Sequence, residues 1–86
     1  MSLSELLRIS RQKTFMTQEA FAKTIHVSVA TINRWENGKS KPNLSAMKRI
    51  KEFCEQNGLQ YSDIEDAWLA PETKSIKERI VQSGLD

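Results

Sequence analysis

Two lysines lie in a short polar stretch near the middle of the chain, RWENGKSKPN, which runs from Arg34 to Asn43. The pair Asn37-Gly38 within it is typical of a helix end, because glycine tolerates the left-handed backbone conformation. We expect such a turn to expose backbone N–H groups, with Lys39 and Lys41 beside them as mobile cations. Both kinds of group suit a phosphate, so the stretch predicts a helix stop that also holds a phosphate.

The remaining reactive side chains form no catalytic or metal-binding set. The chain has one histidine, His26, and one cysteine, Cys54, which lie far apart in the sequence. They cannot fill a tetrahedral zinc site between them, and the chain has no glycine-rich phosphate loop. We therefore expect no enzymatic activity and no cofactor, with His26 on a surface turn and Cys54 in the core. A single cysteine excludes an internal disulfide and fits a reducing cytoplasm.

Charge is unevenly distributed along the 86 residues, although the net formal charge is only +2. Residues 8–51 contain ten Lys or Arg and two acids, a balance of +8, whereas residues 52–86 contain eight acids and three bases, a balance of −5. This asymmetry favours a polyanionic partner for the basic segment, although two ordinary solvated faces would give the same balance. We expect no membrane span, since no apolar run approaches about 18 residues.

Five helices are expected to position these side chains, because residues that favour helices dominate the composition and helix start signals recur. The predicted fold class is therefore all-α. The expected N-caps are Ser2, Thr17, Ser28 and Ser62, the first and last of them in Ser-x-x-Glu capping boxes. The helices are expected at about 3–13, 18–25, 29–36, from 43 or 44 to 56, and from Ser62 to a stop at Pro71.

Apolar residues at helical spacing predict the core. The expected inward residues are Leu3, Leu6, Leu7, Ser10, Phe21, Ala22, Ile25, Ile32, Trp35, Leu44, Met47, Ile50, Phe53, Cys54, Ile64, Ala67, Trp68 and Leu69. For Trp68 and Leu69 the alternative is a contact between two copies of the chain. We expect residues 1–70 to form one domain. In the remaining tail, 71–86, Ile76, Ile80 and Val81 are at helical spacing, so it forms a short helix that folds back or pairs with a second copy, or it frays.

Only three or four residues, around HVS, join the second and third helices, and two short helices joined so tightly cross steeply, as in a helix-turn-helix. Here the stretch Thr17–Asn43 resembles the XRE family, the helix-turn-helix domains of the phage repressor and Cro type. A looser resemblance extends from the first helix to about Leu69. The shared residues are Gln18, Ala22, Ile32, Trp35, Glu36, Asn37, Gly38, Lys39 and Pro42. The family commonly has glycine where this chain has His26, which tolerates the left-handed conformation better than most residues.

The resemblance implies a five-helix, lambda repressor-like fold, with the helix-turn-helix at about 17–36 and helix 29–36 in the major groove of double-stranded DNA. It implies base reading by Val29, Ala30, Thr31, Asn33 and Arg34. It implies phosphate binding by Gln18, Ser28, Asn37, Lys39 and Lys41. An ion pair between Arg11 and Glu36 would tie the reading helix to the first helix. Among the reading residues, Arg34 suits guanine and Asn33 suits adenine, because each can form two hydrogen bonds to that base.

The function that these features predict is a sequence-specific DNA-binding transcriptional regulator of the repressor type, of bacterial or phage origin. Tight binding favours a homodimer on a two-fold operator. One alternative is an antitoxin that autoregulates through the same domain and holds a basic toxin with the acidic segment after Glu52. Another is a protein-interaction module that keeps the fold without binding DNA, although the basic segment argues against it.

Overall fold

Five α-helices make up the part of the chain that the structure, a computed structural model, describes, which is residues 1–70. In chain order they are α1 (Leu3–Lys13), α2 (Gln18–Ile25), α3 (Val29–Glu36), α4 (Leu44–Gln56) and α5 (Tyr61–Leu69). No strand occurs between residues 1 and 70, and the predicted all-α class is confirmed. None of the five helices is both long and apolar enough to cross a bilayer. The predicted tail at 71–86, with Pro71, Ile76, Ile80 and Val81, lies outside the described residues.

Side-chain caps fix the starts of the first four helices. The side chains of Ser2, Thr17, Ser28 and Asn43 each accept a backbone N–H three residues later. Ser2 completes the predicted capping box, because its own N–H donates to Glu5 Oε1. The second predicted capping box is wrong: α5 begins at Tyr61, and Ser62 already lies inside the helix. Half-buried Tyr61 packs against the core, and we infer that this packing, in place of a capping side chain, sets the start of α5.

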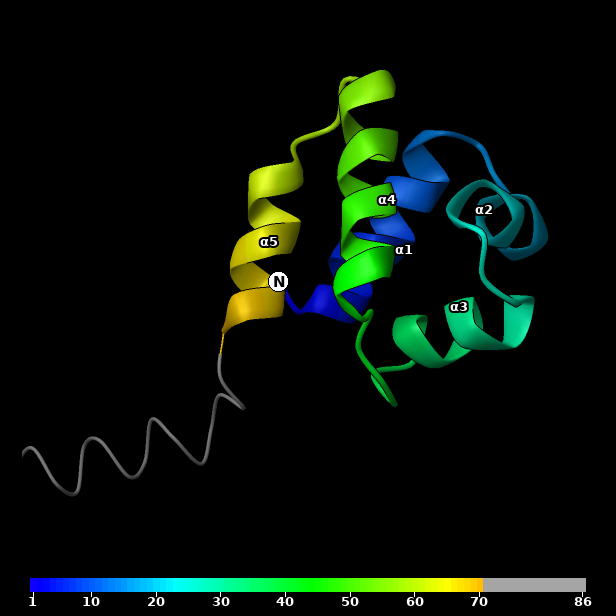
Figure 1. Ribbon diagram of the computed structural model, residues 1–86, viewed down its shortest axis with the longest axis horizontal. Coiled ribbons are helices and arrows are strands. Elements are labelled where there is room, and N and C mark those ends of the chain that lie inside the picture. Colours follow the sequence, from blue (N-terminus) through cyan, green and yellow to red (C-terminus); the bar gives the residue numbers. More distant parts are fainter. Residues whose placement is uncertain (71–86) are drawn as a thin grey trace, which may run out of the picture.

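The core lies where the five helices meet. Figure 1 shows α4 in the middle, with α5 on one side, α2 and α3 on the other, and α1 behind. The rings of Phe21 and Phe53 meet edge to face, with their centroids 5.1 Å apart, and so join α2 to α4. The buried hydrophobic residues are Leu7, Phe21, Ala22, Ile25, Ile32, Trp35, Ala46, Met47, Ile50, Phe53, Cys54 and Ile64. Helical spacing predicted all of these except Ala46.

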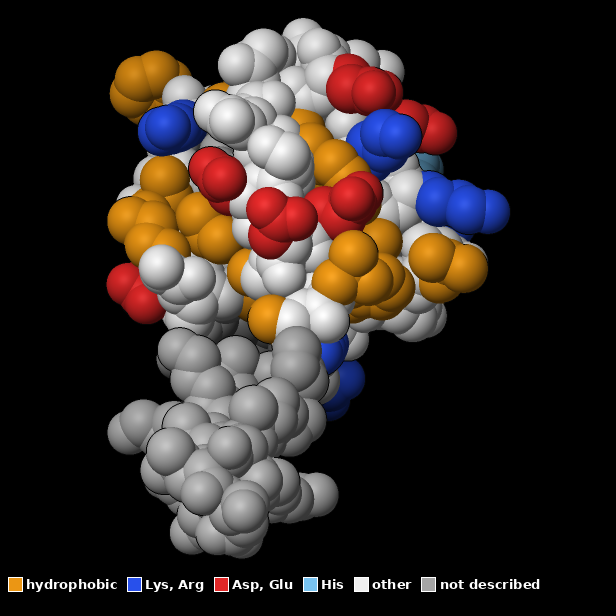
Figure 2. Space-filling view, turned by 90° about the vertical axis from the view of Figure 1, so that its left-hand side faces the viewer, with side chains coloured by type: hydrophobic (Ala, Val, Ile, Leu, Met, Phe, Trp, Pro, Cys, Tyr) orange, Lys and Arg blue, Asp and Glu red, His pale blue; other side chains and the backbone are white. Residues whose placement is uncertain are grey.

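Two leucines at helix ends do not join the core as expected. Leu44 and Leu69 are each 63% exposed, because they are the first residue of α4 and the last of α5, beyond the region where the helices pack. Trp68, one residue earlier, is half-buried against the core, and its Nε1 donates to the carbonyl of Pro42 at 2.7 Å. Figure 2, which looks onto the side that carries α5, shows hydrophobic side chains at the surface among acidic ones.

Two non-glycine residues adopt the left-handed conformation at the turns after α1 and α2. His26 has φ 62° and is exposed, as predicted for a surface turn residue. Phe15 has φ 57° and is 95% exposed, which the sequence did not indicate. Its N–H donates to the carbonyl of Gln12, and the reversal lets Met16 pack against the core. The turn therefore holds a bulky residue in the left-handed conformation, which costs about 1–2 kcal/mol of free energy for a residue other than glycine.

We expect Phe15→Gly to stabilise the domain. Glycine adopts φ 57° without strain, and the exposed ring contributes no burial that could be lost. Relief of the strain outweighs the greater freedom of glycine in the unfolded chain, so we expect a gain of about 0.5–1 kcal/mol, or several degrees in Tm. Thermal unfolding followed by circular dichroism measures it. Phe15→Ala is the matched control, since it removes the ring but keeps the strain; an equal gain from alanine would contradict the explanation.

Candidate nucleic-acid interface

The connection between α2 and α3 consists of three residues that set how the two helices cross. His26 takes the left-handed conformation, and the N–H of Val27 donates to the carbonyl of Ala22 at 3.0 Å. Val27 packs against the core, and Ser28 caps α3 by accepting the N–H of Thr31 at 3.1 Å. The two helices lie side by side at one end of the domain (Figure 1). This is the arrangement of a helix-turn-helix.

The outer face of α3 is free of contacts with the core. Ile32 and Trp35 are 0% and 4% exposed and point inward, as predicted. Val29 is 43% exposed although it is apolar, and Thr31 lies half-buried with its hydroxyl 2.9 Å from that of Ser28. The residues that the structure places on the exposed face are Val29, Ala30, Asn33 and Arg34. These four share one surface, and their role in base reading stays a prediction.

A buried ion pair joins α3 to α1, as the resemblance implied. Arg11 Nε donates to Glu36 Oε2 at 2.7 Å and Arg11 Nη2 to Glu36 Oε1 at 2.9 Å. The side chains of Arg11 and Glu36 are 15% and 4% exposed. Arg11 Nη1 also donates to the carbonyl of Met16, so the guanidinium holds the α1–α2 turn as well. The pair fixes the C-terminal end of α3 on the domain.

The environment of Glu36 keeps this carboxylate charged. Burial alone would raise its pKa, but hydrogen bonds from Arg11 and Gln18, together with the charge of Arg11, outweigh burial and lower the pKa of Glu36. The hydrogen bonds that Arg11 donates to Glu36 raise the pKa of Arg11. Both groups are therefore ionised at neutral pH, and each has its buried charge matched by the other.

Two residues that the resemblance assigned to phosphate form hydrogen bonds within the protein. Gln18 Nε2 donates to Glu36 Oε1 at 3.1 Å, and Gln18 Oε1 accepts from Asn33 Nδ2 at 3.4 Å. Asn37 Nδ2 donates to the Asn33 carbonyl at 2.8 Å and to Asn33 Oδ1 at 3.2 Å. Spacing of four residues on a helix could have indicated the contact between Asn37 and Asn33. No local pattern indicates the contact between Gln18 and Asn33, which depends on how α2 crosses α3.

The turn after α3 differs from its prediction in one respect. Gly38 has φ 72°, so the predicted left-handed stop is confirmed. The expected free N–H groups are wrong, because those of Asn37, Gly38 and Lys39 donate to the carbonyls of Asn33, Trp35 and Arg34 respectively. These bonds satisfy the last carbonyls of the helix, which have no partners within it. The cations Lys39 and Lys41 remain exposed at the turn.

The family comparison agrees with this geometry. A family model described as "Helix-turn-helix" matches residues 7–55, from within α1 to the end of α4. The chain belongs to this helix-turn-helix family. The predicted membership of the XRE type is thereby confirmed. The HTH-type transcriptional activator BcrR of Enterococcus faecalis is 38% identical to the helix-turn-helix chain over 53 residues, which are 62% of this chain and 26% of that protein. The match therefore spans only about a quarter of this relative's length. No solved structure matches the helix-turn-helix chain.

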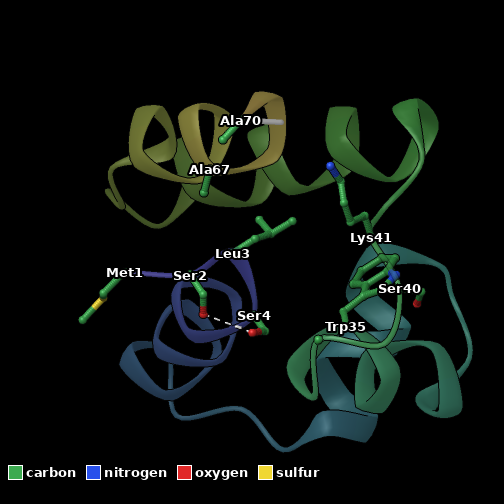
Figure 3. Close-up of a pocket in the computed structure, with 10 residues that line it drawn as sticks. Met1, Ser2, Leu3, Ser4, Trp35, Ser40, Lys41, Ala67 and Ala70 are labelled. Atoms are coloured by element: carbon green, nitrogen blue, oxygen red, sulfur yellow. Dashed lines mark hydrogen bonds between the residues drawn. The ribbon is translucent and has the colours of Figure 1, made fainter. Parts of the chain in front are cut away.

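A cleft of about 460 Å³ lies beside the turn of the helix-turn-helix domain. Figure 3 shows Trp35, Ser40 and Lys41 on one side of it, the start of the chain on another, and Ala67 and Ala70 at the end of α5 on the third. Lys41 lines this cleft and Lys39 does not. The two cations therefore have different surroundings, although both lie at the turn.

The reactive side chains of the helix-turn-helix domain stay apart. Cys54 is buried, and burial raises the pKa of its thiol to about 11. His26 lies exposed on the α2–α3 turn. Between residues 1 and 70 no three His, Cys, Asp or Glu side chains are grouped so that they could hold a metal ion. Cys54 thus acts as a small core residue, as predicted.

Proposed function

We propose that this helix-turn-helix domain binds double-stranded DNA in a sequence-specific manner and regulates transcription, with α3 in the major groove. The observation that carries the proposal is the exposed face of α3, where Asn33 and Arg34 stand beside exposed Val29 on a helix held firmly from behind. Family membership and the similarity to a protein named as a transcriptional activator support it.

The shape of α3 suits this role. An α-helix with its side chains is about 10–12 Å across, and the major groove is about 12 Å wide. Arg34 offers the paired donors that guanine accepts, and Asn33 the donor and acceptor that match adenine. Val29 and Ala30 offer apolar contacts for a thymine methyl group. Lys39 and Lys41, at the end of α3, would meet the phosphates beside the groove.

Two finer features belong to the same proposal. A single domain buries only about 600–1,000 Å² on DNA, so tight binding favours two copies on a two-fold operator. For such a dimer, Leu44 and Leu69 offer exposed apolar surface. They lie at neighbouring ends of α4 and α5, which the hydrogen bond from Trp68 to the Pro42 carbonyl holds together. We also propose repression, because a bound domain blocks other proteins from an overlapping site. No enzymatic step is proposed, since the only thiol is buried and protonated at neutral pH.

Selection from a random duplex library tests the proposal, with an Asn33→Ala, Arg34→Ala double variant in parallel. We expect the chain to enrich a palindrome whose half-site spacing reports the dimer. The double variant should lose at least about 30-fold in affinity for that sequence, because each base contact contributes about 1–3 kcal/mol of discrimination. Gln56→Ala is the control and should leave binding unchanged, because Gln56 is exposed at the C-terminal end of α4, which lies away from α3 (Figure 1).

Two other outcomes of the selection have distinct meanings. Weak, salt-sensitive binding without any enriched sequence would contradict the proposal and leave only a cationic surface. It would then favour one of two alternatives: the interaction module, or the antitoxin whose acidic segment after Glu52 holds a basic toxin. If a sequence is enriched, a reporter gene behind it shows the sign of regulation, and we expect the chain to lower its expression.

A further inference from the structure

The cleft beside the turn after α3 is lined mostly by small residues. They come from three segments, the start of α1, the turn itself and the end of α5, and small side chains leave the space between these segments open. Its volume of about 460 Å³ lies within the range of about 300–1,000 Å³ that is usual for small-molecule sites. The small residues are Ser2, Ser4, Gly38, Ser40, Ala67 and Ala70.

The walls of the cleft combine apolar surface with one positive charge. Leu3 points into the cleft from the start of α1, and Ala67 and Ala70 face it from α5 (Figure 3). Among the lining residues that the structure describes, Lys41 carries the single charged side chain, and no carboxylate stands beside it in the cleft. The half-buried hydroxyl of Ser40 adds a hydrogen-bond donor. A cation beside an apolar wall suits an anion that has an apolar body.

The same cleft reaches the turn that carries the cations proposed for phosphate. Lys41 lines the cleft, whereas Lys39, two residues earlier in the turn, does not. The start of α1 closely approaches this turn, because a Cβ added at Gly38 would stand 3.8 Å from the hydroxyl oxygen of Ser4. An anion in the cleft therefore draws the ammonium group of Lys41 toward the cleft, and leaves Lys39 free to meet DNA.

We propose that this cleft binds a small organic anion with an apolar body, and that the anion competes with a DNA phosphate for Lys41. The competition with DNA rests on the proposed function above, whereas the binding of the anion does not. Because the coupling between two ligands is reciprocal, the anion weakens the binding of DNA by the same factor as DNA weakens the binding of the anion. The anion thus promotes release of the domain from its operator.

Titration of the full chain with octanoate, in the absence of DNA, tests the site. Octanoate joins a carboxylate to an apolar chain, and octanamide is the matched neutral control. We expect saturable changes in the amide NMR shifts of Gly38 and Ala67 and none at Gln56, which lies at the other end of α4. Octanamide should bind about fivefold more weakly, the upper end for the loss of an exposed ion pair. Unchanged shifts at Gly38 and Ala67, or equal binding of both probes, overturn the inference.

Two pairs of variants locate the octanoate. Lys41→Met should weaken its binding by about fivefold, whereas Lys39→Met, the matched control in the same turn, should leave it unchanged. Ala67→Phe fills the cleft and should abolish binding. Ala70→Phe fills it from the position after the last residue of α5, where the substitution does not disturb the helix. Thermal unfolding verifies that the variants are folded, and octanoate binding that survives both phenylalanine variants contradicts the assignment.

A second measurement tests the competition with DNA. Saturating octanoate should flatten the slope of log K against log salt for the selected operator by about 0.9, the value for one phosphate contact, with sodium chloride matching the added salt in the controls. Lys41→Met should show the flatter slope without octanoate and no further response to it, whereas Lys39→Met should still respond. An operator affinity that octanoate leaves unchanged overturns the competition. A chain that enriches no sequence contradicts the proposed function instead, and the titration without DNA still decides the site.

Discussion

Glu36→Ala is expected to destabilise the domain by about 3–5 kcal/mol, because it leaves the guanidinium of Arg11 buried without its partner. The Arg11 side chain is only 15% exposed, and within residues 1–70 its remaining acceptor is the carbonyl of Met16. A loss of this size is comparable to the whole stability of a small domain, which is about 0.05–0.15 kcal/mol per residue. We therefore expect much of the variant to be unfolded at 37 °C. Urea unfolding followed by circular dichroism measures the change.

A paired variant separates the lost partner from the lost packing. Arg11→Met with Glu36→Leu removes both charges and fills the space, and it should recover most of the stability, since apolar residues often replace a buried ion pair without loss. A Glu36→Ala variant whose free energy of unfolding lies within about 1 kcal/mol of that of the unaltered chain would contradict this account of the ion pair.

The same ion pair makes the folding stability of the domain depend on pH in the acid range. The pKa of Glu36 is lower in the folded state than in the unfolded state, whose ordinary value is 4.5. Its stabilisation is therefore complete above about pH 4.5 and is lost as the pH falls through the folded pKa. Glu36→Gln, which has no carboxyl group to titrate, should show a flatter decline in this range.

Lys39→Ala combined with Lys41→Ala is expected to make DNA binding much less sensitive to salt. Each phosphate contact contributes about −0.9 to the slope of log K against log salt, so loss of two should flatten the slope by about 1.8. Between 50 and 200 mM salt this corresponds to roughly a tenfold smaller fall in affinity. Titrations of the selected duplex at several salt concentrations measure it. The preference for that sequence should persist, because lysines on phosphate do not read bases.

Lys51→Ala provides the control for charge alone. Lys51 lies about 6.0 Å from the ring centre of Tyr61, near the start of α5 and away from the turn after α3. Its removal changes the net charge by the same amount per lysine but should alter the slope little. If it flattens the slope as much as either turn lysine does, the phosphate contacts are not localised at the turn.

Local rules predicted most of the fold. The starts of α1, α2 and α3 follow from one predicted capping oxygen each, and the inward residues of α2 and α3 follow from helical spacing. The start of α5 did not follow, because no side chain caps it and the packing of Tyr61 is a tertiary effect. Leu44 was placed wrongly because spacing alone does not reveal where α4 passes beyond the core.

The candidate site was predicted less completely. The resemblance implied the pair Arg11–Glu36, which the structure confirms at 2.7 Å. The amide contacts of Gln18 and Asn33 were missed, since they join residues 15 apart through the crossing of two helices. The turn sequence predicts free N–H groups, but the structure shows that they bond to the last carbonyls of α3, which a helix end must satisfy first.

The bond from Trp68 to the carbonyl of Pro42 has a spectroscopic consequence. The chain has two tryptophans, and both flank the turn that follows α3: Trp35 lies buried at its start, and Trp68 holds its far end. Indole emission depends on the polarity and hydrogen bonding around the ring. The intrinsic fluorescence of this protein therefore originates beside Lys39 and Lys41, and a change in that turn alters the emission of an unlabelled chain.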